Sequence, residues 1–170
     1  MSESSIDTED RLPKEGSLLT NEVCQRHRQI LSARFEKQEK YWIAQQEKDS
    51  AANPSKRDGR VARDSAMAMS YRTLTPYVAP DLRSFTFRDH DNQNYAMDTV
   101  EKWHTFSKLP QTAYEDLARY RTLALVFRFA SEAADEGKPI KYTQKNHVTC
   151  ESYWKWYEQV TQSPKISTAH

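Results

Sequence analysis

One segment constrains the fold more than any other, because residues Thr112 to Gly137 carry both a start and a stop signal for a helix. Thr112 and Glu115 have the spacing of a capping box, in which each side chain accepts a hydrogen bond from the other residue's backbone N–H. Gly137, with Pro139 close behind, is typical of a helix end, where glycine takes the left-handed conformation. The two signals predict a helix over 113–136.

The middle of this predicted helix is apolar. Leu123 to Ala130 contains a single polar side chain, that of Arg128. A helix that is apolar on all sides is normally buried in a protein core, and a run of about eight residues is too short to span a bilayer. The sequence therefore predicts an all-α fold, an irregular helical bundle with this helix at its centre.

Composition argues against several classes of ligand site. The chain of 170 residues holds only 3 glycines, whereas average usage would give about a dozen. Phosphate-binding loops and dinucleotide-binding turns need closely spaced glycines, and Gly16, Gly59 and Gly137 are isolated. The net charge of +1 argues against general binding of polyanions. No cofactor is expected.

The sequence also predicts a compartment. No apolar stretch resembles a signal peptide or a membrane span. Two cysteines in a chain of this length do not make a disulfide framework. We therefore expect the protein in the cytoplasm or another reducing intracellular compartment, with both thiols free. We do not expect it to be secreted or to bind or span a membrane.

The N-terminal part is expected to hold a tail and a long helix. Residues 1–19 are rich in Ser, Glu and Asp, a composition that predicts disorder. Thr20 is a candidate cap for a helix over 20–50, and Leu19 and Cys24 have the spacing of a hydrophobic staple. A helix of this length measures about 45 Å, more than a small domain spans. We expect it to project and to pack only in part on the core.

The long helix carries a thin apolar stripe, in which Leu31, Phe35 and Trp42 follow Cys24 at helical spacing. Most other side chains of the helix are charged or are glutamine. An amphipathic helix that packs only in part can lay such a stripe into the groove of a partner. We therefore expect Leu31, Phe35 and Trp42 to contact another protein subunit.

In the rest of the chain, the sequence predicts shorter helices joined by polar loops. Ser84 to Phe87 alternates like an extended edge, but one such run does not make a sheet. The predicted organisation is a basic linker over 51–60, a helical core domain over 61–162 and a C-terminal tail over 163–170. Besides the central helix, the core domain is expected to contain helices near 61–74, 94–108 and 149–162.

A mirrored pair of motifs suggests a metal site. Cys24-x-x-His27 and His147-x-x-Cys150 each place a thiol and an imidazole three residues apart, on one face of a helix. Together they supply a Cys₂His₂ set for zinc. Structural zinc sites usually use closely spaced cysteines instead, so two buried cysteines beside polar histidines is the favoured interpretation. A zinc-stabilised helical module remains a third hypothesis.

Signals for catalysis are weak. The run Asp89 to Asn92 lacks the glycine and the final glutamate of a calcium loop, and it is interpreted as a turn that caps the next helix. Glu101-x-x-His104 occurs once, whereas a di-iron helical bundle needs a second copy. The sequence contains no G-x-S-x-G or H-E-x-x-H motif. We therefore expect a protein that is not an enzyme.

Two arginines lie seven residues apart on the apolar central helix, and a buried guanidinium must be paired or must reach a surface. Arg121 and Arg128 can be paired within the chain, since Glu132 and Asp135 follow Arg128 by four and seven residues. Alternatively, the two arginines line a groove that contacts phosphates or an acidic partner. Internal pairing is the favoured interpretation.

Further basic residues make nucleic acid a candidate partner. Lys56, Arg57, Arg60 and Arg63 cluster near the linker, although Asp58 and Asp64 dilute their charge. Such a connection can contact phosphates without sequence preference. In the last predicted helix, Trp154 is expected to face outward, where it could stack on a base or anchor a protein contact. The protein contact is the commoner use.

These observations give one leading expectation and one main alternative. The leading expectation is a structural or interaction protein, a subunit of a homo- or hetero-oligomeric assembly that docks through its helix stripe and Trp154. The alternative is a nucleic-acid-binding helical protein, such as a nucleoprotein or a packaging component. Its phosphate-binding residues would be Lys56, Arg57, Arg60, Arg63, Arg121 and Arg128.

Overall fold

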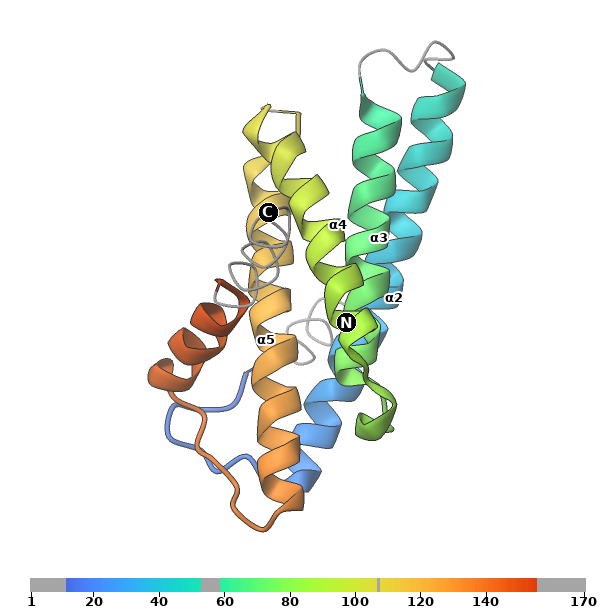
Figure 1. The fold of residues 1–170 in the computed structure, drawn as a ribbon. Helices are drawn as coiled ribbons and strands as arrows, with labels where there is room; N and C mark the ends of the chain where they lie inside the picture. Colours follow the sequence, from blue (N-terminus) through green and yellow to red (C-terminus); the bar gives the residue numbers. More distant parts are fainter. Residues whose placement is uncertain (1–11, 53–58, 107, 156–170) are drawn as a thin grey trace, which may run out of the picture.

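The computed structural model describes residues 12–52, 59–106 and 108–155, and this part of the chain is all-α, as predicted (Figure 1). A single isolated bridge joins Leu18 and Lys141, and the described residues form no strand. The helices are α2 (Asn21–Ala52), α3 (Arg60–Val78), the short 3₁₀ helix η1 (Leu82–Ser84), α4 (Phe87–Thr105), α5 (Gln111–Asp135) and a last helix that covers 144–155.

The predicted central helix is confirmed as α5. All eight residues from Arg121 to Arg128 are buried, and α5 contacts α2, α3 and α4. The last helix covers a further side of α5, where Phe129 and Tyr153 pack edge to face at 5.2 Å between ring centroids. Because neighbours surround α5, its middle has to be apolar on all sides.

The two ends of α5 are capped in different ways. At the C-terminus, Gly137 has a φ of 78°, and Lys138 N–H donates to Ala133 O at 2.9 Å, as in a Schellman motif. This end confirms the prediction. The predicted capping box of Thr112 is wrong, because the helix starts two residues earlier, at Gln111 after Pro110, with no side-chain cap. Pro110 occupies the N-cap position with a φ of −57° and a ψ of 139°, and its side chain has no acceptor for a helix N–H.

The predicted start of the long helix α2 is confirmed. Val23 N–H donates to the Thr20 hydroxyl oxygen at 3.3 Å, and Leu19 and Cys24 are both fully buried. However, α2 does not project alone. The antiparallel α3, with 19 residues against the 32 of α2, runs beside the C-terminal part of α2 (Figure 1), and Arg63 pairs with Asp49 at 3.4 Å close to the far end of the hairpin.

The apolar stripe of α2 lies inside this chain. Leu31, Phe35 and Trp42 are only 6%, 0% and 7% exposed, and all three belong to the main hydrophobic core. The prediction that they contact another subunit is therefore wrong. A narrow apolar stripe is enough to pack α2 on the core, because α3 and α5 together cover only one narrow side of this helix.

The helices α3 and α4 are longer than predicted. α3 continues through Pro76, because Tyr77 and Val78 are buried in the core and hold the last turn. α4 starts at Phe87, after a capping box in which Asp89 N–H donates to the Thr86 hydroxyl at 3.2 Å. Ser84 thus ends η1, Phe85 and Thr86 form a short extended link, and Phe87 starts α4, so this run is not a sheet edge. The box escaped prediction because its acidic member is Asp, whereas the common pattern has Glu or Gln.

The segment directly before α2 is ordered by the chain's C-terminal part, in contrast to the predicted disorder of residues 1–19. Gly16 N–H donates to Tyr142 O at 2.7 Å, and Leu19 N–H donates to Ile140 O at 2.8 Å. Backbone groups that pair in this way no longer need water. The rest of the predicted tail, residues 1–11, lies outside the described residues, as does the predicted C-terminal tail.

Candidate functional site

A cleft of about 520 Å³ opens between α4, α5 and the last helix. Buried Arg121 and buried Trp154 line it side by side, in contact with each other. Charged side chains of both signs surround the mouth of the cleft. Its lining includes Met97 and Glu101 from α4, Arg119 and Arg121 from α5, and His147, Glu151 and Lys155 from the last helix.

Arg121 is held rigidly in the wall of this cleft. It is only 8% exposed, and its Nε and Nη2 donate to Gln93 Oε1 and Asn94 Oδ1, each at 2.7 Å. Its guanidinium lies 3.8 Å from the centre of the Trp154 ring, a cation–π contact. Arg121 therefore lines a groove, but side chains of α4 and the last helix already engage its guanidinium, and contact with phosphates or an acidic partner stays a prediction.

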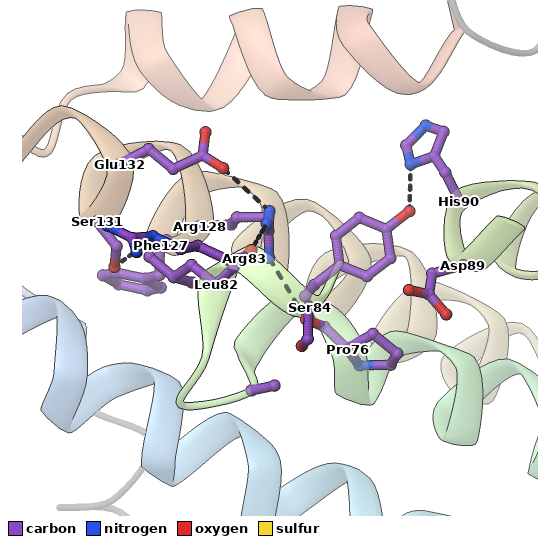
Figure 2. A network of polar contacts seen from close by, with 12 residues as sticks. Pro76, Leu82, Arg83, Ser84, Asp89, His90, Phe127, Arg128, Ser131 and Glu132 are labelled. Carbon is purple, nitrogen blue, oxygen red and sulfur yellow. Dashed lines mark hydrogen bonds and ion pairs between the residues drawn. The ribbon is translucent and has the colours of Figure 1, made fainter. Parts of the chain in front are cut away.

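Arg128 serves the core, as the favoured interpretation predicted. Its Nε lies 3.3 Å from Glu132 Oε2, and its guanidinium also donates to the carbonyl oxygens of Pro76 and Leu82 (Figure 2). Phe85 stacks on the guanidinium at 4.2 Å. Arg128 thus ties α5 to the end of α3 and to η1, and it is not part of the cleft lining.

Trp154 is 3% exposed, so the predicted outward position is wrong. Its indole Nε1–H donates to Arg121 O at 3.2 Å. The buried face of the last helix is the one that Cys150 and Trp154 share at a spacing of four residues. The rest of this predicted helix, residues 156–162, lies outside the described residues.

A buried histidine connects the cleft to the core. His90 is 3% exposed and stacks on Trp154 with 4.8 Å between ring centroids and 4° between planes. The hydroxyl of Tyr77 is hydrogen-bonded to His90 Nδ1. Burial, and after it the positive charge of Arg121, lower the pKa of His90 to about 4, while Asp91 opposes the change. The run Asp89 to Asn92 is the first part of α4 and not a turn.

This histidine predicts acid sensitivity. The pKa of His90 is lower in the folded chain than in the unfolded chain, where it is that of an ordinary histidine. Below about pH 6.5, the unfolded state therefore binds more protons than the folded state. Its contribution to stability is therefore fully present above pH 6.5 and is lost between pH 6.5 and about 4, by about 3 kcal/mol at most. Urea unfolding at a series of pH values measures this loss. His90→Asn should flatten that part of the profile, and an unchanged slope in this variant would contradict the assignment.

The four candidate zinc ligands do not meet. Cys24 donates weakly to Leu19 O, and His27 stacks on Phe127. His147 is hydrogen-bonded to Tyr142, and Cys150 is buried, which raises the pKa of its thiol to about 12. Within the described ranges, no three His, Cys, Asp or Glu side chains are placed to hold a metal ion. The zinc hypothesis fails on this geometry.

The basic cluster is only partly described. Lys56 and Arg57 lie outside the described residues. Arg60 and Arg63 approach Asp49 at 3.8 and 3.4 Å, and Arg63 also lies 2.9 Å from Asp64. Burial and then Asp49 raise the pKa of Asp64 to about 6. Arg121 and Arg128, the other described members of the predicted phosphate-binding set, are buried. Among the described residues, the members of this set therefore do not share one exposed surface.

A second candidate surface was missed from the sequence. α4 and its C-cap expose three aromatic side chains, Phe87 at 82%, Tyr95 at 66% and Phe106 at 64%. They could be placed on one helix only once α4 is known to start at Phe87, seven residues before the predicted start. Solvent exposure of several large aromatic side chains on one helix is typical of interaction surfaces.

Comparison with known proteins adds no assignment, because no family model, no curated protein and no solved structure matches the chain. In the part of the chain described by the structure, no helix combines the length and the apolar character needed to span a bilayer.

Proposed function

We propose that the protein is a non-enzymatic interaction protein, a subunit of a larger assembly, that docks through the solvent-facing side of α4. The observation that carries the proposal is the exposure of Phe87, Tyr95 and Phe106. Aromatic side chains dominate the energetics of protein interfaces. The chain buries the apolar stripe of α2 in its own core.

The helix α4 is well suited to present such a surface. Its capping box fixes the N-terminal turn, and its opposite side is anchored by buried Ala96, Met97 and Val100. A rigid helix loses little conformational entropy when a partner binds. Exposed aromatics on this scaffold are therefore pre-arranged for contact.

The test is a double substitution, Tyr95→Ala with Phe106→Ala, introduced into the native chain. We expect the particle that contains the protein in gentle lysates to shrink, as measured by sedimentation, because each truncated anchor weakens binding by roughly tenfold. Val148→Ala, at a residue that is 51% exposed on the last helix, is the matched control. A particle of unchanged size in the double variant, with unfolding also unchanged, would refute the proposal.

A further inference from the structure

The exposed side of α4 carries residues whose spacing is the same from the N-terminus to the C-terminus as in the reverse direction. Six residues on this side are separated by four, four, three, four and four positions. At 3.6 residues per turn they fall within about 100° of arc, so they form one stripe along the helix. The stripe consists of Phe87, Asp91, Tyr95, Asp98, Lys102 and Phe106, of which only Asp98 is half-buried and the rest are exposed.

The chemistry of the stripe is complementary to itself. When two copies of α4 lie antiparallel about a twofold axis between Met97 and its neighbour Ala96, each position meets its mirror position. Phe87 then faces Phe106, Asp91 faces Lys102, and Tyr95 faces Asp98 of the second copy. Every one of these pairs is favourable, as aromatic packing, as an ion pair, and as a hydrogen bond from phenol to carboxylate.

Other arrangements of the same two stripes are unfavourable. In a parallel pair each residue faces its own copy, so Asp91, Asp98 and Lys102 each meet a like charge. An antiparallel pair centred on Tyr95 brings Arg88 opposite Lys102, again with like charges. Like charges placed opposite each other oppose association. Of the arrangements compared, charge favours the antiparallel pair centred between Ala96 and Met97.

We propose that the partner seated on this stripe is a second copy of the chain, joined in an antiparallel, twofold-symmetric α4–α4 contact. The inference rests on the proposed function and specifies its partner. A helix of 19 residues is about 28 Å long. A single helix pair of this length gives a small interface, so we expect a weak dimer with a dissociation constant on the order of 10 µM.

The experiment uses a charge swap in the purified full chain, followed by sedimentation velocity over a range of concentrations. Asp91→Lys replaces two symmetric ion pairs by two like-charge contacts, so dimerisation should weaken by about tenfold or more. Lys102→Asp should have the same effect. The double variant Asp91→Lys with Lys102→Asp restores both pairs and should return the dissociation constant to that of the unaltered chain.

The control is Glu47→Lys, which makes the same change in charge at an exposed position of α2. Thermal unfolding of each variant confirms that the fold is kept. A double variant that stays dissociated, or an equal weakening by Glu47→Lys, would overturn the α4 pairing.

An unaltered chain that stays monomeric at all concentrations would also overturn the self-association. If Tyr95→Ala with Phe106→Ala then still shrinks the native particle, the proposed function stands with a different partner. If the double aromatic substitution has no effect either, both proposals fail.

Discussion

Replacing Phe35 with alanine is expected to lower the free energy of unfolding by about 3–5 kcal/mol. Phe35 is fully buried, and its ring lies 6.1 Å from the rings of both Tyr71 and Tyr120. Alanine would leave a cavity where α2, α3 and α5 meet, and a close-packed core collapses only in part around such a space. Urea denaturation followed by far-UV circular dichroism measures the loss.

A matched control lies on the same helix. Ile43 is 38% exposed, so Ile43→Ala should cost less than about 1 kcal/mol. If Phe35→Ala were equally mild while the isolated chain stayed folded, the side chain would not have the core position described above. Its main role would then lie in contact with a partner, as the sequence alone suggested.

The second large effect is expected at Arg128. Arg128→Ala should cost about 3–5 kcal/mol, because it leaves buried hydrogen-bond acceptors without a donor and removes a packed side chain. Two carbonyl oxygens, those of Pro76 and Leu82, lose their contact with the guanidinium (Figure 2). Phe85 loses its stacking partner at 4.2 Å. Thermal and urea unfolding measure the change.

The ion pair alone should matter much less than the carbonyl contacts. Glu132 is 48% exposed, and exposed ion pairs contribute about 0–1 kcal/mol. Glu132→Gln is therefore expected to cost under about 1 kcal/mol. Equal losses in Glu132→Gln and Arg128→Ala would show that the ion pair, and not the carbonyl contacts, holds the end of α3.

The main features of the fold follow from local signals. The apolar run Leu123 to Ala130 predicts the central helix because only a surrounded helix tolerates such a sequence. The Thr20 cap and the left-handed Gly137 mark helix ends through their own backbone groups. Each of these signals acts within one or two helical turns, so none depends on knowing the tertiary structure.

The candidate site could not be predicted in the same way. Arg121 and Trp154 meet only because the last helix packs across α5, and Gln93 and Asn94 reach Arg121 from α4. Sequence spacing does not encode such contacts between helices. The same limit applies to Trp42, since an apolar stripe looks alike whether its own chain or a partner covers it.

The aromatic residues of α4 were not recognised as one surface because of a small error in the predicted helix boundary. Its first member, Phe87, follows the capping box of Thr86 and Asp89, which differs from the usual pattern only in having Asp where Glu or Gln is common. A boundary placed seven residues late separated Phe87 from Tyr95. The palindromic pattern is visible only when all of α4 is read as one helix.

The bridge between Leu18 and Lys141 has a consequence for the order of folding. The hairpins α2–α3 and α4–α5 form from neighbouring parts of the chain, and local contacts form quickly. The bridge joins the two ends of the described chain, so it carries a large loop-closure cost. During synthesis on a ribosome, residues 12–19 must wait for the segment around Lys141 to emerge. We therefore expect this N-terminal segment to be the last part of the fold to gain protection from hydrogen exchange.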